Sequence, residues 1–286
     1  MRFVQFLLHG ERKLGLERGN DGDIVDLCAG DRRIPTDLRS FIEGGDKNLK
    51  FAENLVEERE CVLSRDSVRI VAPILNPEKV LCVGMNYRDH CEEQNAPVPE
   101  EPVVFNKFPS CIIGPTDDLE YPTETRKLDW EVELAFIIGK AGRHIQEDDA
   151  MKHIFGFTVA LDVTARDWMK GENGGQVLLG KAMDGFCPLG PAIVTKDEID
   201  DPHNLGIRCK VNGVIKQNSD TNQLVHKSAA IIAHISRFIT LKPGDVILTG
   251  TPPGVGIARK PPEFLKRGDV VQCEIDCLGK IINRVV

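Results

Sequence analysis

The segment 130–136, WEVELAF, alternates large apolar residues with two glutamates. Successive side chains of a β-strand point to opposite faces, so this pattern predicts a strand with one apolar face and with Glu131 and Glu133 together on the other face. A two-residue step along a strand spans about 6.6 Å, a separation at which two glutamates can share one hard cation. A strand with a solvated acidic face fits the same pattern, so this segment alone leaves the metal site open.

Further β-type runs flank this segment in the sequence, separated by Pro and Gly clusters. Between two of them lies Asn212-Gly213, the residue pair that a tight hairpin turn prefers. One helical pattern, Lys227–Ile239, carries an apolar stripe that we expect to face the core. The runs do not alternate with helices, so the predicted fold is α+β, mainly β and mostly antiparallel. The predicted strands are Pro102–Phe105, Trp130–Ile138, Phe155–Asp162, Ile207–Gln217, Asp245–Thr249, Val270–Cys277 and Lys280–Val285.

The first 70 residues or so predict a small α/β cap. A turn signal at Asn76-Pro77 separates this part from the rest of the chain. We therefore predict an N-terminal domain at residues 1–70 and a catalytic domain at residues 71–286. The elements expected in the cap are strands near 2–8 and at Asp23–Leu27, followed by helices around Thr36–Glu43 and Lys47–Glu60.

The composition disfavours several kinds of partner. The chain of 286 residues has 36 basic and 44 acidic side chains and a formal net charge of −8, which argues against nucleic acid or an anionic membrane surface. No apolar run approaches the roughly 18 residues of a membrane span.

The cysteines indicate the compartment. Nine cysteines without a CxxC pair, and no N-glycosylation sequon, favour a reducing intracellular compartment with most thiols buried. The first residues, MRFVQFLLHGERK, fit neither a signal peptide nor a mitochondrial presequence.

Common catalytic motifs are incomplete in this chain. Gly175–Lys181, GQVLLGK, matches a phosphate-binding loop, but Ala182 stands where a Ser or Thr must hold magnesium. Residues 254–256, GVG, begin a dinucleotide fingerprint whose third glycine is replaced by Arg259. No Gly-x-Ser-x-Gly or His-Glu-x-x-His motif occurs. Nucleotide binding, serine hydrolysis and zinc proteolysis are therefore disfavoured.

A third carboxylate follows another apolar strand. In residues 155–167, FGFTVALDVTARD, the apolar run ends on Asp162 and turns into a helix-like segment, so this carboxylate can face a cleft. Three carboxylates without a nearby His or Cys suit Mg²⁺, Mn²⁺ or Ca²⁺ better than zinc. We predict a cation site at Glu131, Glu133 and Asp162, where a 2-oxo acid could replace bound waters.

A possible general base follows a third strand. In residues 79–95, KVLCVGMNYRDHCEEQN, a strand precedes a short helix that carries His90 and Glu93. Residues three apart share one helix face, so Glu93 can orient His90, and such a pair supplies a general base near neutral pH. An incidental pair on a surface helix is the alternative.

Five ordered motifs together resemble the fumarylacetoacetate hydrolase superfamily over about residues 70–286, and more loosely over the N-terminal part. They are CVGMNYRDH at 82–90, DWEVELAFIIG at 129–139, ALDVTARDW at 160–168, LLGKAMDGFCPLGP at 178–191 and DVILTGTPPGVG at 245–256. The resemblance implies a mixed β-roll or sandwich with a small N-terminal α/β cap, and a homodimer. It also implies Mg²⁺ or Mn²⁺ on the three carboxylates, with Ca²⁺ as a possible substitute. The site residues that follow from it are His90 and Glu93 on a mobile lid helix, Lys181 as the active-site lysine, and Lys107, Arg166 and Thr251 as substrate-binding residues.

One position departs from the family pattern. Seven residues after the metal aspartate, many members carry a glutamine that is thought to place water or substrate, and this chain has Met169 there. A thioether cannot donate a hydrogen bond and accepts one only weakly. The substitution therefore puts hydrolysis in doubt more than enolisation, because moving a proton between carbon and oxygen needs no positioned water.

We predict a metal-dependent enzyme that acts on small 2-oxo acids, and the resemblance implies keto–enol tautomerisation of oxaloacetate as the leading reaction. The alternatives are hydrolysis of a carbon–carbon bond in an acylpyruvate, and decarboxylation of oxaloacetate. A non-catalytic metabolite-binding or interaction protein on the same fold is the hypothesis from another class, motivated by Met169. The resemblance favours the mitochondrial matrix over the cytoplasm as the compartment.

Overall fold

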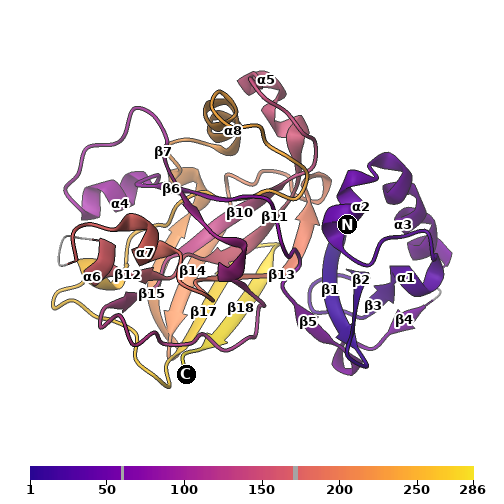
Figure 1. Ribbon diagram of the computed structural model, residues 1–286, viewed down its shortest axis with the longest axis horizontal. Helices are drawn as coiled ribbons and strands as arrows, with labels where there is room; N and C mark the ends of the chain where they lie inside the picture. Colours follow the sequence, from indigo (N-terminus) through magenta and orange to yellow (C-terminus); the bar gives the residue numbers. More distant parts are fainter. Residues whose placement is uncertain (59–60, 170–172) are drawn as a thin grey trace.

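The structure is a computed structural model that describes residues 1–58, 61–169 and 173–286. A large β-rich body carries most of the chain, and a smaller unit made by the N-terminal residues, indigo in Figure 1, lies beside it. In the described part of the chain, the main sheet has 12 strands and runs through both parts, because β1 (Arg2–Leu8) of the N-terminal unit pairs with β13 (Cys187–Thr195) of the body.

The N-terminal unit has the predicted α/β character. The apolar and alternating residues of β1 form the expected strand, and Asp37 caps α2 by accepting a hydrogen bond from Ser40 N at 2.9 Å. Two strands were not predicted, β2 (Glu11–Glu17) and β4 (Val62–Leu63). Strand β2 is rich in charge and forms by pairing with β1, and β4 pairs with β3. The predicted residues 59–60 of the second helix lie outside the described residues. The elements are β1 (Arg2–Leu8), β2 (Glu11–Glu17), β3 (Ile24–Asp26), α1 (Leu27–Gly30), α2 (Leu38–Glu43), α3 (Asp46–Glu58), β4 (Val62–Leu63) and β5 (Arg69–Val71).

The proposed division near residue 70 falls on β5, which pairs with β1 and so completes the N-terminal unit. The body continues the sheet in the order β13, β11, β10, β16, β6 and β7, and its neighbours are antiparallel except β16 with β6 and β8 with β13. This confirms the α+β, mainly antiparallel fold. The strands are β6 (Val80–Gly84), β7 (Val103–Lys107), β8 (Ile112–Ile113), β10 (Val132–Ile138), β11 (Ile154–Leu161), β13 (Cys187–Thr195) and β16 (Val246–Leu248).

Strand β13 was not predicted, although all nine of its residues are buried. Its sequence CPLGPAIVT contains Pro188, Gly190 and Pro191, which read locally as turn signals. The strand forms because β1 and β11 pair with it on both sides. Long-range pairing therefore outweighs the local signal.

A second sheet packs against the first and gives the predicted sandwich. Its strands β17 and β18 contact β11 and β13 of the main sheet. The Asn212-Gly213 hairpin is confirmed, with positive φ angles of 51° and 77° at its two residues. The strands of this sheet are β14 (Gly206–Val211), β15 (Val214–Asp220), β17 (Val270–Ile275) and β18 (Gly279–Arg284), and β9 (Leu128–Asp129) with β12 (Thr164–Ala165) forms a small third sheet.

The helix predicted at 227–239 is shorter than expected. It is α8 (Ser228–Ser236), which buries Ile231, Ile232 and Ile235 as predicted. Phe238 and Ile239 are 62% and 37% exposed, because the chain leaves the helix after Ser236 and its apolar stripe no longer faces the core. The remaining helices are α4 (Arg88–Glu93), α5 (Glu147–Ala150), α6 (Arg166–Met169) and α7 (Val177–Lys181), with 3₁₀ turns at Arg65–Ser67, Pro109–Cys111, Met151–His153, Lys196–Glu198, Thr221–Gln223 and Gly256–Ala258.

The predicted burial of most thiols is confirmed, since six of the nine cysteines are buried and all nine are free. Among the described residues, no helix has both the length and the apolar character that a membrane crossing requires.

Candidate active site

Antiparallel pairing of β10 with β11 brings the three predicted carboxylates together. Glu133 lies on β10, Glu131 precedes that strand, and Asp162 directly follows β11. Asp162 N donates to Glu131 O at 2.9 Å. One ligand oxygen from each carboxylate lies within 4.8 Å of the others, and the residues are only 5%, 1% and 0% exposed in chain order. The strand therefore has no solvated acidic face, because both of its faces are covered.

Cationic side chains contact two of these carboxylates. Lys181 Nζ lies 2.6 Å from Glu131 Oε2 and 2.5 Å from Asp162 Oδ2, while Arg166 Nη2 lies 2.5 Å from Glu131 Oε1. Burial raises the pKa of Glu131, but Lys181 and Arg166 outweigh it and lower that pKa to about 2. Burial lowers the pKa of Lys181, but Asp162 and Glu131 outweigh it and raise that pKa. Glu131 and Lys181 are thus held in their charged forms.

Glu133 has a different environment. Its Oε2 accepts a hydrogen bond from Gly250 N at 2.7 Å. Burial, followed by the charges of Asp162 and Glu131, raises its pKa well above the usual value. A bound cation would relieve this repulsion, because it would give the third carboxylate a positive partner.

The donor set fits a hard divalent cation. All three groups offer carboxylate oxygens, and one oxygen of each lies close enough to the others to share one ion. The buried cluster as a whole has one more carboxylate than cationic side chains. Its members are Asp129, Glu131, Glu133 and Asp162 on the acidic side and Lys107, Arg166 and Lys181 on the basic side. With all of these groups ionised, the cluster has a net negative charge. A divalent ion would make the net charge of the cluster positive and would favour an anionic substrate.

The predicted His90–Glu93 pair forms on α4. The two side chains meet with His90 Nδ1 and Glu93 Oε2 2.9 Å apart. A carboxylate only accepts, so Nδ1 carries the hydrogen and Nε2 is left for another partner. Glu93 Oε1 accepts from Gly254 N at 2.8 Å, which ties α4 to the loop after β16. His90 is 6% exposed, so this is no incidental pair on a surface helix.

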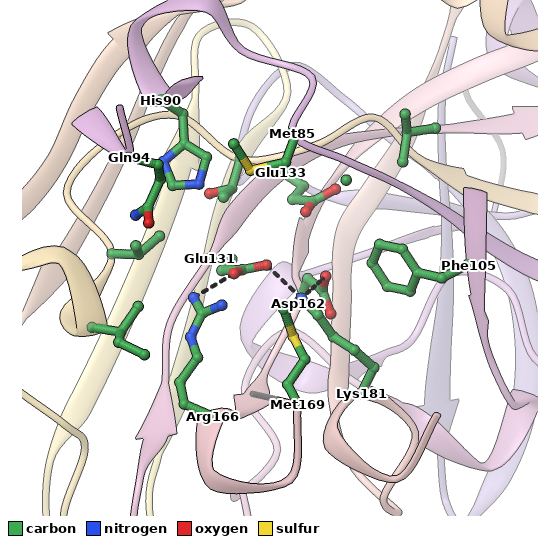
Figure 2. Close-up of a pocket in the computed structure, with 15 residues that line it drawn as sticks. Met85, His90, Gln94, Phe105, Glu131, Glu133, Asp162, Arg166, Met169 and Lys181 are labelled. Carbon is green, nitrogen blue, oxygen red and sulfur yellow. Dashed lines mark hydrogen bonds and ion pairs between the residues drawn. The ribbon is translucent and has the colours of Figure 1, made fainter. Parts of the chain in front are cut away.

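A cavity of about 100 Å³ connects these groups. In Figure 2, His90 and Gln94 are drawn on one side of the carboxylates, and Arg166, Met169 and Lys181 on the other. A cavity of this size suits a small acid better than a nucleotide cofactor, since typical ligand pockets reach about 300 Å³ or more. The lining residues are Val83, Gly84, Met85, His90, Gln94, Phe105, Glu131, Glu133, Asp162, Arg166, Met169, Lys181, Thr251, Val255 and Ile257.

The lining residues that the sequence analysis missed include Met85, Gln94 and Phe105. Met85 has a positive φ of 52°, a strained conformation that is common at functional sites and has no sequence signal here. Gln94 ends the helix that carries His90, so its place four residues after His90 could have indicated the same face. Phe105 lies on β7, and its ring faces the Lys181 ammonium at 5.0 Å.

The predicted substrate-binding residues divide into two kinds. Thr251 and Arg166 line the cavity. Thr251 Oγ1 donates to Val132 O at 2.9 Å, and Arg166 also binds Asp129 through Nε at 2.7 Å. Lys107 is not among the described lining residues, and its side chain has no exposed surface. The structure therefore gives no support for direct contact of Lys107 with substrate, and its ammonium instead lies 2.7 Å from Asp162 Oδ1.

The fold and this acidic site define a class of protein. Residues 79–286 match the family model described as fumarylacetoacetate (FAA) hydrolase C-terminal, and the chain belongs to this family. The resemblance drawn from the five motifs is thereby confirmed.

Named relatives cover the whole chain. The chain is 58% identical to "Oxaloacetate tautomerase fahd2, mitochondrial" of Xenopus laevis, and the match covers 100% of this chain and 90% of the relative. It is 56% identical to "Oxaloacetate tautomerase FAHD2A, mitochondrial" of Homo sapiens, with coverage of 100% and 92%.

Solved structures have the same fold. A putative HpcE protein from Mycobacterium smegmatis has a TM-score of 0.88 and 36% identity over 100% of this chain and 99% of its own. The maleylpyruvate hydrolase from Sphingobium sp. SYK-6 in complex with manganese (II) ion and pyruvate has a TM-score of 0.81 and 30% identity, with coverage of 100% and 99%.

Proposed function

We propose that this protein is a metal-dependent oxaloacetate keto–enol tautomerase. The main support for this proposal is the buried triad of Glu131, Glu133 and Asp162, which lines the same small cavity as His90 of the His90–Glu93 pair. Relatives that are 58% and 56% identical over the whole chain bear the name oxaloacetate tautomerase. The names point to oxaloacetate, and the small cavity with its cationic side chains supports a small anionic substrate of this kind.

The proposed cofactor is Mg²⁺ or Mn²⁺, held by Glu131, Glu133 and Asp162. Three carboxylates suit these ions, and a structural relative is described in complex with manganese (II) ion and pyruvate, itself a 2-oxo acid. When bound, such an ion would act as a Lewis acid that polarises the ketone oxygen of the substrate.

His90 has the position of the proton-transfer group. Its Nδ1 is held by Glu93, so Nε2 is the nitrogen available to the cavity. In the keto-to-enol direction, Nε2 takes a proton from the carbon beside the ketone and then gives this proton to the ketone oxygen, so that His90 returns to its starting form. Glu93 stabilises the positive charge that His90 carries in between.

Lys181 supplies a fixed positive charge at the reacting oxygen. An ammonium has three N–H donors, and two are directed at Glu131 and Asp162, so the third is available to a substrate oxygen. Charge that develops on the ketone oxygen is stabilised most by donors that are already in place before the reaction. Burial between two carboxylates holds this ammonium in place.

Met169 favours tautomerisation over hydrolysis. It lines the cavity on the side opposite His90 in Figure 2, and Met85 adds a second thioether. Neither side chain can hold a water molecule with a strong hydrogen bond. These two side chains are therefore poorly suited to positioning an attacking water, whereas moving a proton within the substrate does not require one.

The decisive experiment uses the purified protein with Mg²⁺ and enol-oxaloacetate. We expect metal-dependent loss of the enol absorbance without release of pyruvate. Pyruvate release would indicate decarboxylation, and cleavage of an acylpyruvate would indicate hydrolysis. If Mg²⁺ and Mn²⁺ accelerate none of these reactions, the enzyme proposal is wrong and a metabolite-binding role replaces it.

We also propose a homodimer in the mitochondrial matrix. The compartment follows from the word mitochondrial in the names of the relatives.

In the proposed homodimer, a second copy would cover an apolar face formed by the edge strand β7 and by α7, which contact each other. Its exposed residues are Val103, Val104, Phe108, Val177, Leu178 and Leu179. Sedimentation of the purified chain tests this assembly, and a monomer at micromolar concentration would exclude it.

A further inference from the structure

Lys107 is a buried lysine to which the proposed mechanism gives no role. It ends β7, whose Val103 and Val104 are 50% and 36% exposed, whereas the Lys107 side chain has no exposed surface. Removing an ammonium from water costs several kcal/mol unless partners compensate for the lost hydration. The partners of Lys107 therefore indicate its role.

Three oxygens surround the Lys107 ammonium. Nζ lies 2.7 Å from Asp162 Oδ1 and donates to Val163 O at 3.1 Å and to Lys181 O. Asp162 and Val163 follow β11, whereas Lys181 ends α7. One side chain thus joins the segment that supplies a carboxylate of the triad to the segment that supplies the cavity lysine.

Asp162 lies between two lysines with different surroundings. Lys181 contacts Oδ2 at 2.5 Å and lines the cavity. Lys107 contacts Oδ1 and is not among the described residues that line the cavity. One lysine can therefore reach a substrate, and the other can act only through Asp162 and the end of α7.

We propose that Lys107 is a positioning residue, which holds Asp162 and the end of α7 in the arrangement that binds the divalent cation. The inference rests on the proposed function, because it concerns the cation of that site. It replaces the sequence-based expectation that Lys107 binds substrate.

The change in metal affinity on neutralising Lys107 distinguishes a positioning role from a purely electrostatic one, because the two roles predict changes of opposite sign. A positive charge beside Asp162 repels a divalent cation, so electrostatics alone predicts tighter metal binding when Lys107 is neutralised. Groups that orient a metal ligand have the opposite effect, since their loss costs about 10-fold to 100-fold in metal affinity. The positioning role therefore predicts that the divalent cation binds more weakly when the Lys107 charge is removed, although this charge has the same sign as the cation.

The test compares Mn²⁺ affinity of the full chain with that of Lys107→Met by isothermal titration calorimetry. We expect binding at least about 10-fold weaker in the variant. Turnover of oxaloacetate should recover as Mn²⁺ is raised, with a KM for oxaloacetate close to that of the wild type. Equal or tighter Mn²⁺ binding would overturn the proposal, and so would a raised KM that excess Mn²⁺ does not relieve.

Lys79→Met is the matched control. Lys79 Nζ lies 3.0 Å from the buried Asp245, so this variant also removes a lysine from a buried aspartate, but neither residue lines the cavity. We expect it to lower thermal stability without changing Mn²⁺ affinity. A similar loss of affinity in both variants would show a general effect of destabilisation and would refute a specific role for Lys107.

Lys107→Gln covers the case in which Lys107→Met does not fold. It keeps an N–H donor without the charge, and we expect an affinity between those of the wild type and Lys107→Met. A crystal structure of the wild type with Mn²⁺ and pyruvate gives an answer independent of any variant. Contact of Lys107 with Asp162 supports the proposal, and contact with pyruvate refutes it.

The proposed function and this inference fail in different ways. A wild type that binds Mn²⁺ without turning over oxaloacetate would refute the tautomerase proposal, while the Lys107 comparison would stand because it is made on affinity. A wild type that binds no Mn²⁺ would refute the metal site and the positioning role together.

Discussion

The two sides of the cavity differ in the kind of chemistry that they offer. On the α4 side, His90 presents Nε2, a ring nitrogen that can take and return a proton. On the α6–α7 side, Arg166 and Lys181 present fixed positive charges among buried carboxylates. Proton transfer and charge stabilisation are thus assigned to different segments of the chain, and the acidic triad lies between them. Each side can be altered separately.

The largest effect is expected at the triad that both sides share. Glu133→Gln should abolish nearly all metal-dependent turnover, because it removes a carboxylate ligand. It should also raise the melting temperature without metal, since Glu133 is buried beside two other carboxylates. Enol absorbance and thermal unfolding measure the two effects.

Glu131→Gln is the matched control for Glu133→Gln. It should also abolish turnover, but it should lower the melting temperature, because Glu131 is the partner of Arg166 and Lys181. Equal melting temperatures in the two variants would contradict the difference that we draw between these glutamates.

On the α4 side, His90→Asn should lower kcat by about 1000-fold, within the range found for general acid–base groups. Mn²⁺ affinity should be unchanged, because His90 makes no ion pair with the triad among the described residues. Steady-state kinetics and calorimetry measure the two quantities. A variant with full kcat would remove proton transfer from this side of the cavity.

On the α6–α7 side, Lys181→Met should lower kcat by about 100-fold, as loss of an oxyanion donor does. Mn²⁺ binding should be as tight as in the wild type or tighter, because two triad oxygens lose a competing partner. This is the opposite of the effect expected for Lys107→Met. Weaker Mn²⁺ binding in Lys181→Met would mean that Lys107 and Lys181, which both contact Asp162, have the same role.

The smallest effect on tautomerisation is expected for Met169→Gln. The amide restores a hydrogen-bonding group in the cavity, and we expect less than about a 10-fold change in enol conversion. Hydrolysis of an acylpyruvate should rise, as product analysis by chromatography would show. If hydrolysis does not change, Met169 is not what disfavours it.

Much of the site follows from local pattern. Alternation in residues 130–136 predicted that the two glutamates point to the same side, and the end of an apolar run predicted that Asp162 faces a cleft. The three carboxylates do come together, although Glu131 precedes β10. Spacing along a helix likewise paired His90 with Glu93. The role of Lys107 could not be found in this way, since its contact Asp162 is far away in sequence.

The sequence by itself determined the periodicity of the strands, the Asn212-Gly213 turn and the close spacing of Glu131 and Glu133, because these depend on neighbouring residues alone. Only the tertiary structure decided that β10 is covered on both faces and that β13 is a strand. It also decided that two glutamates two residues apart differ in charge environment, with Glu131 between cations and Glu133 beside a backbone N–H. Burial and long-range pairing set these properties, and both arise when distant segments meet.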